Sequence, residues 1–370
     1  MLRISNFDDW IDYFYGWQKD IGLDAPEFSE YKFEAKYGQL PNNEIEFGDY
    51  KGHLRWKSVM HIPDQRIRDA AQNLIVYQGD TEFASVEQQR HLFETAPSRY
   101  DYLSLVRVMT EEMRHGWQMS HLLVSQFGRS GRIEAQKLLE RRAFTDDRLL
   151  GAFNEIVANW LDFYTYTQFV DRDGKFQLTM LSYSGFEPLA QSMLPMLKEE
   201  SYHLGTGNNG LRRIVQAGRI PTDIMQRYYN KWLPTSFDLF GTDHSSSAQW
   251  SYVWGLKGRY NEREVADHAA DKEKLNDDAR QLYREETVKL TELLNKLVPE
   301  EQPKLCVPDI KFNRHIGQYK GQYWTVDGKE LTADEYEKYL PTALPTDEDK
   351  QTLASIMKEK DWIAPKREEL

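Results

Sequence analysis

Two four-residue motifs constrain the fold of this 370-residue chain more than any other feature. Glu112-x-x-His115 and Glu200-x-x-His203 each place a carboxylate and an imidazole three residues apart. On a helix this spacing puts both side chains on one face, where they can bind the same metal ion. The motifs lie 88 residues apart, which is too far for one helix and suits two antiparallel helix pairs. One such motif is weak evidence for a metal, but two of them predict a di-iron site inside a four-helix bundle.

Apolar residues at helical spacing predict four long helices around the motifs. We expect them at residues 63–95, 98–127, 149–170 and 188–217. The glycine-rich segment 128–132 should break the chain after the second helix and lead to a short charged helix at 133–142. Residues 171–174 could be a loop or a continuation of the third helix, and the pattern leaves this open.

The whole chain is therefore predicted to be all-α, a ferritin-like four-helix bundle with extra helices and a small C-terminal α+β appendage. We expect an N-terminal extension (1–62), the bundle (63–262), an amphipathic helix packed on it (263–300) and the appendage (301–370). Within these regions, 7–20 and 221–232 should be helices and 241–258 a loop. The appendage should contain a hairpin turning at Asp327-Gly328 and short helices after Thr332 and Thr346.

Composition excludes several classes of protein. The net charge is −12, and no basic stripe interleaves with aromatic residues, which argues against nucleic-acid binding. Cys306 is the single cysteine, so the chain holds neither an internal disulfide nor a cysteine-bound iron–sulfur cluster. We find no apolar run of membrane-spanning length and no signal-peptide pattern, and we expect a cytoplasmic protein without membrane contact.

A bundle site also needs one carboxylate from each of the two remaining helices. The candidates are Asp80, Glu82 and Glu87 on the first helix and Glu155, Asp162, Asp171 and Asp173 on the third. In an antiparallel helix pair, two ligands at the same height along the helix axes are separated in sequence by half of each helix and the turn between them. Glu82 precedes Glu112 by 30 residues and Asp171 precedes Glu200 by 29, and this near-symmetry favours Glu82 and Asp171.

Each motif is preceded by a second acid, Glu111 or Glu199, which poses a similar choice. Glu111 and His115 are also a workable pair at four-residue spacing, but the three-residue pairing is the one that repeats. Glu111 and Glu199 then point about 100° away, towards solvent or a supporting role.

The donor set contains oxygen and nitrogen but no thiolate, which suits iron or manganese better than copper or zinc. Residues 205–210 match the glycine pattern of dinucleotide-binding loops. They follow a predicted metal-binding helix rather than a strand, so we interpret this match as accidental.

Several segments resemble a known family. Residues 78–90, 127–132, 149–155 and 167–178 are similar to the oxygenase component family of benzoyl-CoA 2,3-epoxidase. These are ferritin-like di-iron oxygenases related to the catalytic subunit of phenylacetyl-CoA epoxidase. The resemblance covers roughly residues 45–260. The motif at 198–203 is more similar to the phenylacetyl-CoA enzyme, and the acyl group therefore stays open.

The resemblance implies a site and a reaction. The implied ligands of two iron ions are Glu82, Glu112, His115, Asp171, Glu200 and His203. Glu112 and Glu200 would bridge the irons and act in catalysis. Gln78, one helical turn before Glu82, would bind the thioester carbonyl of the substrate.

The implied protein is a monooxygenase that uses dioxygen to epoxidise the ring of an aryl-CoA thioester, benzoyl-CoA or a close relative, in aerobic aromatic degradation. Because this sequence shows no flavin or nicotinamide fold, we expect a separate NAD(P)H-dependent reductase as partner. A homodimer is one possible assembly. The alternative is a ferritin-like di-iron protein for iron storage or peroxide reduction, which would share the ligands but need no acyl-CoA cavity.

Overall fold

A computed structural model describes residues 3–23, 26–143, 145–243, 245–264 and 274–366 of the chain. Among these residues there are helices and turns but no strand, and sheet-type pairing is limited to isolated bridges such as Trp324–Glu330. The predicted all-α class is confirmed. No helix in the described ranges is both long and apolar enough to cross a membrane.

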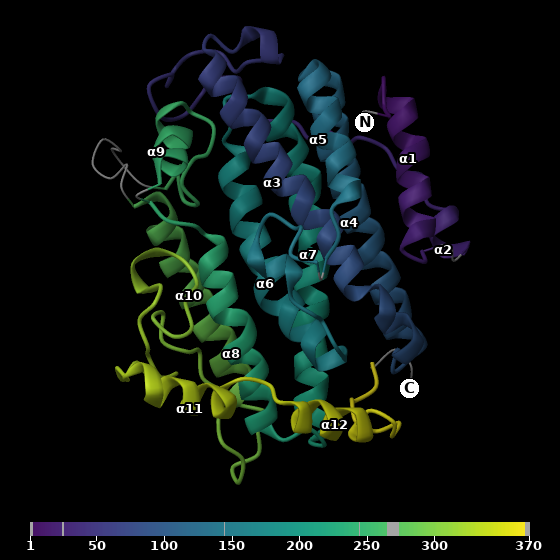
Figure 1. Cartoon of the computed structure of the whole chain (residues 1–370), viewed down its shortest axis with the longest axis vertical. Coiled ribbons are helices and arrows are strands. Elements are labelled where there is room, and N and C mark those ends of the chain that lie inside the picture. The colour runs from purple at the N-terminus through teal and green to yellow at the C-terminus, as the bar shows by residue number, and fades with distance from the viewer. Residues whose placement is uncertain (1–2, 24–25, 144, 244, 265–273, 367–370) are drawn as a thin grey trace.

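Four long helices run side by side along the molecule's long axis (Figure 1). They are α3 (Gln65–Gln89), α4 (Arg99–Gln126), α6 (Trp160–Ser182) and α7 (Glu187–Ala217). Short connections make α3 antiparallel to α4, and α6 antiparallel to α7. The two pairs are joined where α4 packs against α7, so the inner faces of the long helices meet in one core.

Capping side chains explain where these helices begin. Asp64, Ser98 and Asn159 each accept a hydrogen bond from a backbone N–H of the first turn of α3, α4 and α6. Such caps satisfy N–H groups that have no partner within the helix. The first two starts agree with the sequence prediction, as does the start of α7 beside Pro188.

The third long helix was predicted at the wrong place. Instead of beginning at residue 149, α6 begins at Trp160, and it continues through 171–174 to Ser182. The preceding residues form a 3₁₀ turn, η3 (Gly151–Asn154), and a loop. Leu149 is held there by its backbone N–H, which donates to Asp80 Oδ2 at 2.8 Å. A tertiary hydrogen bond therefore outweighs the local helical pattern.

The glycine-rich segment after α4 also differs from expectation. It opens a helix, α5 (Gly128–Glu140), rather than a loop. Gly128 has a φ of +56°, a backbone conformation that glycine adopts without strain, and this single residue turns the chain. The predicted break is one residue long, and the helix after it is longer than predicted.

Residues 205–210 lie inside α7, where glycine allows α6 and α7 to approach closely. A Cβ atom at Gly207 would lie 2.6 Å from the backbone nitrogen of Gln168. One at Gly210 would lie 2.1 Å from the ring of Tyr164. Packing of two helices accounts for these glycines, since no strand–turn–helix setting surrounds them.

Further helices cover the bundle. They are α1 (Phe7–Asp20), α2 (Pro26–Ser29), α8 (Thr222–Leu239), α9 (Ser246–Val253), α10 (Leu275–Asn295), α11 (Ala333–Ala343) and α12 (Asp347–Ile356). Helix α9 lies in a segment predicted to be a loop, and α10 begins beyond residues 265–273, which are outside the described part of the chain. Figure 1 shows α11 and α12 crossing one end of the bundle.

The C-terminal segment has its predicted helices but not its β structure. Thr332 and Thr346 form capping boxes at the starts of α11 and α12. The turn at Gly328 forms, with Thr325 N–H donating to the Lys329 carbonyl at 2.8 Å. One bridge is too little to make a strand, so the α+β description of the appendage was wrong. The domain boundaries stay a prediction.

Candidate metal centre

Carboxylates and imidazoles from three long helices meet in the core. Glu82 of α3, Glu112 of α4 and His115 form one group of potential ligands, and Glu112, Glu200 and His203 form a second. Within each group the ligand atoms lie within 4.8 Å of one another, and all of these residues are buried. Glu112 belongs to both groups and is therefore placed to contact two adjacent ions.

Asp171 of α6 lies beside these groups. It is buried, and its Oδ2 atom has no hydrogen-bond partner among the described residues. Burial, followed by the charges of Glu112 and Glu200, raises the pKa of Asp171 well above its usual value. All four long helices thus contribute to one set of six candidate ligands, which we call the ligand cluster: Glu82, Glu112, His115, Asp171, Glu200 and His203.

The ligand cluster is crowded with like charges. Burial and the neighbouring charge of Glu82 raise the pKa of Glu112 to about 8. Glu200 Oε2 has no hydrogen-bond partner within the described structure. Buried carboxylates that lack donors are costly unless a cation compensates them. The oxygen-rich donor set and its unsatisfied atoms therefore fit bound metal ions.

Each histidine is held from the opposite helix by the acid that precedes the other motif. His115 of α4 contacts Glu82 Oε2 through Nδ1 at 3.2 Å and Glu199 Oε2 through Nε2 at 2.9 Å. His203 of α7 contacts Glu111 Oε2 through Nε2 at 3.1 Å. The Nδ1 atoms of both rings thus face the ligand cluster, while Glu111 and Glu199 fix the far nitrogens. Such outer carboxylates orient metal-binding imidazoles.

Cations in turn hold the two outer carboxylates. Arg114 donates to both oxygens of Glu199, at 3.0 and 2.8 Å from its Nε, and Arg107 Nε donates to Glu111 at 2.9 Å. Burial disfavours the charged form of Glu199. The hydrogen bonds and charges of His115 and Arg114 outweigh this effect and lower its pKa to about 2. Glu199 is therefore a stable anion.

The other acids that the sequence offered as ligands have different surroundings. Asp80 and Glu87 both pair with Arg148, with oxygen–nitrogen distances of 3.1 Å. Asp162 pairs with Lys231 at 2.9 Å, and Glu155 is exposed. Asp173 is buried, lines the pocket beside the ligand cluster, and accepts a hydrogen bond from Gln177 at 3.0 Å.

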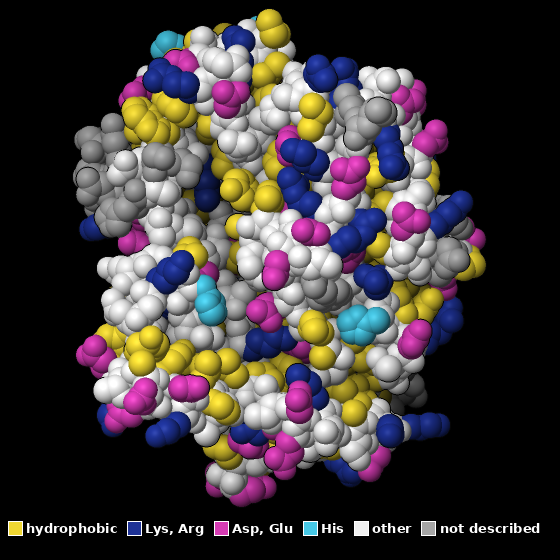
Figure 2. Space-filling model, viewed as in Figure 1, with side chains coloured by type: hydrophobic (Ala, Val, Ile, Leu, Met, Phe, Trp, Pro, Cys, Tyr) yellow, Lys and Arg dark blue, Asp and Glu magenta, His cyan; other side chains and the backbone are white. Residues whose placement is uncertain are grey.

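A pocket of about 640 Å³ lies beside the ligand cluster and is lined by residues of α3 and α6, although none of the six cluster residues lines it. Gln78 lines it and donates to Glu82 Oε1 at 2.6 Å, so this residue lies between pocket and cluster. Gly174 lines it too, and a Cβ there would lie 3.8 Å from Glu200 Oε1. Figure 2 shows this face of the molecule hollowed between α3 and α9. The predicted contact of Gln78 with a substrate stays a prediction.

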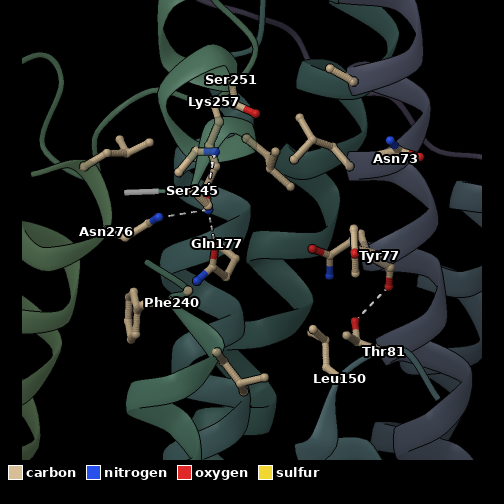
Figure 3. A pocket seen from close by; sticks show the side chains of 18 of the residues that line it. Asn73, Tyr77, Thr81, Leu150, Gln177, Phe240, Ser245, Ser251, Lys257 and Asn276 are labelled. Atoms are coloured by element: carbon tan, nitrogen blue, oxygen red, sulfur yellow. Dashed lines mark hydrogen bonds between the residues drawn. The ribbon is translucent and has the colours of Figure 1, made fainter. Parts of the chain in front are cut away.

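Sequence reasoning missed the polar residues across this pocket from α3. Lys257, Gln177 and Asn276 form one wall, opposite Tyr77 and Thr81 (Figure 3). They come from segments that are distant in sequence, so no local spacing links them. The one available signal was a single lysine within a short glycine-flanked stretch, 255–258.

Comparison with known proteins gives a consistent picture. A family model described as phenylacetic acid catabolic protein matches residues 60–326. Benzoyl-CoA oxygenase component B from Aromatoleum evansii is 36% identical over 378 aligned positions, covering 88% of this chain and 79% of that protein. One of the subunits of 1,2-phenylacetyl-CoA epoxidase from Escherichia coli (strain K12) is 25% identical over 187 positions, covering 50% of this chain and 52% of that protein. The resemblance inferred from the sequence is confirmed.

Proposed function

The chain belongs to the phenylacetic acid catabolic protein family, and we propose that it is a di-iron monooxygenase acting on an aryl-CoA thioester. One atom of dioxygen would add across a carbon–carbon bond of the aromatic ring to give an epoxide, and the other would leave as water. Benzoyl-CoA or a close relative would be the substrate, in aerobic aromatic degradation. The observation that carries this proposal is the buried ligand cluster beside a pocket large enough for an acyl group, with Gln78 contacting both.

Two iron ions fit the ligand cluster in charge and in donor type. Two divalent ions carry four positive charges, which balance the carboxylates of Glu82, Glu112, Asp171 and Glu200. Oxygen and imidazole ligands without thiolate suit iron. A carboxylate from each of two helices and a Glu-x-x-His motif from each of two others match the di-iron sites of ferritin-like bundles, and we extend this architecture to the present fold. When bound, the irons would supply the activation of dioxygen.

The protein's own residues would fix the geometry of this site. Glu112, which belongs to both groups of ligands, and Glu200 would help to hold the ions and act as the catalytic carboxylates. Glu111 and Glu199 would keep the two imidazoles in the tautomer with Nδ1 free for metal. Gln78 uses one amide N–H for Glu82 and has a second for the carbonyl oxygen of a thioester. Burial of the ligands excludes water from the reacting atoms.

The reaction also consumes two electrons and two protons. We propose that a separate NAD(P)H-dependent reductase supplies the electrons and that both proteins act in the cytoplasm. The name of the relative from Aromatoleum evansii, component B, supports a system of several components for that protein.

The decisive test is turnover with a supplied reductase, with benzoyl-CoA and phenylacetyl-CoA as separate substrates under ¹⁸O₂. We expect one labelled oxygen atom in the product of one thioester and two irons per chain. A protein that binds two irons but gives no labelled product with any aryl-CoA would instead support iron storage or peroxide reduction. A protein that binds no iron after reconstitution would exclude both.

A further inference from the structure

Lys257 has no carboxylate partner in the structure as described. Its Nζ donates to Gln177 Oε1 at 2.7 Å and to Asn276 Oδ1 at 3.5 Å, which are both neutral acceptors. By contrast, buried Arg114, Arg148 and Arg213 each contact a carboxylate. An ammonium group has three N–H donors, so one of those of Lys257 is left for a further acceptor.

This lysine lines the pocket beside the ligand cluster. Figure 3 shows Lys257, Gln177 and Asn276 linked on one wall of the pocket. Burial lowers the pKa of Lys257 to about 8, while the charges of Asp173 and Asp243 act in the opposite direction. Keeping such a cation without an ion pair costs stability, and a cost of this kind is typical of functional sites.

The axial offset between Asp171 and Gln177, the residue that binds Lys257, fits one part of a thioester. Gln177, which binds Lys257, lies six residues after Asp171 on α6, or about 9 Å along the helix axis. In a coenzyme A thioester the first amide carbonyl of the pantetheine arm lies about 6 Å beyond the thioester carbon when extended. The phosphates lie much farther along the arm. With the acyl group at the ligand cluster, an amide carbonyl would reach the level of Lys257.

We propose that Lys257 is a substrate-positioning residue that donates a hydrogen bond to an amide carbonyl of the pantetheine arm. Gln177 and Asn276 hold its ammonium group in place for this contact. The contact would fix how far the thioester enters the pocket, and therefore which ring atoms lie next to the ligand cluster. This inference rests on the proposed function, because it takes an acyl-CoA thioester as the ligand.

The test measures binding rather than turnover. Full-length, iron-loaded protein without reductase is titrated with benzoyl-CoA, with benzoyl-pantetheine, which keeps the amides but lacks phosphates, and with S-ethyl thiobenzoate, which lacks both. Lys257→Met should weaken binding of the first two about tenfold to hundredfold, since a charged hydrogen bond is lost. Binding of S-ethyl thiobenzoate should not change, and Lys257→Arg should recover part of the lost affinity.

Lys175→Met is the matched control, because this lysine lies on α6 two residues before Gln177 but pairs with Glu286 at 2.8 Å and does not line the pocket. It should bind all three compounds as the parent does. Thermal denaturation identifies any variant that fails to fold, in which case Lys257→Arg carries the comparison. Equal affinities of Lys257→Met and the parent would overturn the inference. Weakening confined to benzoyl-CoA would also overturn it, because the contact would then be with phosphate.

The outcomes also separate this inference from the proposed function. If amide-dependent binding through Lys257 is found but no oxygen is transferred, the proposed reaction fails and the positioning role stands. If the parent protein oxygenates benzoyl-CoA but Lys257→Met binds it equally well, only the positioning role fails.

Discussion

Helix α3 takes part in two buried acidic regions whose surroundings are opposite. On one side, Asp80 and Glu87 form an arginine-paired network with Arg148. Their remaining oxygens accept backbone N–H groups, from Leu149 and Ala143, at 2.8 and 2.7 Å. On the other side, Glu82 joins the ligand cluster, which holds four carboxylates and no arginine or lysine.

The presence or absence of a paired cation distinguishes the acids of the network from those of the ligand cluster better than the degree of burial does. Asp80, Glu82 and Glu87 are all less than 5% exposed, so exposure alone cannot tell them apart. In the network every carboxylate oxygen of Asp80 and Glu87 has a cation or a backbone N–H as partner, which makes these charges part of the fold. The ligand cluster has unsatisfied oxygens and like charges, an arrangement that bound cations would stabilise.

The largest effect should follow a change inside the ligand cluster. Glu112→Gln removes the carboxylate shared by both groups of ligands, and we expect iron below two per chain and turnover at least about 10,000-fold lower, equivalent to ~5.5 kcal/mol. The metal-free variant should be about as stable as the parent, because the pKa of Glu112 is raised to about 8 and the amide then replaces a mostly uncharged carboxyl at pH 7. Iron analysis, steady-state turnover and urea unfolding measure these three outcomes. Unchanged iron and turnover would remove Glu112 from the site.

A change in the arginine-paired network should lower stability but leave iron binding intact, the reverse of what is expected for Glu112→Gln. Arg148→Met removes the buried cation shared by Asp80 and Glu87 and leaves them only the longer pairs with Arg141 and Arg142, at 3.4 and 3.7 Å. We expect a loss of about 3 kcal/mol in the free energy of unfolding. Folded protein should still take up two irons. Urea unfolding gives the stability, with Lys137→Met as a control that breaks a half-exposed pair and should cost less than about 1 kcal/mol. A loss of iron from folded Arg148→Met would mean that the two regions are not independent.

An intermediate effect should come from the outer carboxylates. Glu199→Gln keeps the shape of the side chain but removes the anion that holds His115, and iron affinity should fall about 10–100-fold. Chelator competition measures this, and Glu111→Gln should give a similar loss through His203. If neither variant changes iron affinity, the two carboxylates serve the fold rather than the metal.

The smallest effect is expected at Glu155, an acid that sequence spacing alone could not dismiss as a ligand. It is exposed, so Glu155→Gln should change stability by less than about 0.5 kcal/mol and leave iron content unchanged. Thermal denaturation and iron analysis are sufficient. A loss of iron would show that the loop before α6 reaches the ligand cluster.

Much of this arrangement could be predicted because it repeats. The two Glu-x-x-His motifs located α4 and α7, and the nearly equal separations of 30 and 29 residues predicted Glu82 and Asp171 at the level of the motifs. Helix starts with a proline or a capping side chain, as at Ser98, were also readable from local sequence.

Other parts depend on contacts between distant segments, which local patterns do not contain. The apolar pattern after Leu149 suggested a helix, but Asp80 holds that backbone in a loop. The glycines of α7 look like a nucleotide loop until α6 is seen packed against them. The wall formed by Lys257, Gln177 and Asn276 comes from three separate segments, and only the folded chain brings it together.

Glu199 of α7 contacts His115 of α4, and Glu111 of α4 contacts His203 of α7. These reciprocal contacts have a consequence for how α4 and α7 must come together during folding. Each imidazole is steadied by an acid on the facing helix, so neither half of the centre is complete until the two helices are in register. Sliding one helix by a single residue would part both contacts at once. The two histidine–carboxylate contacts therefore fix the register of α4 and α7 together. Inserting or deleting one residue within either motif should be far less tolerated than the same change in the connecting loops.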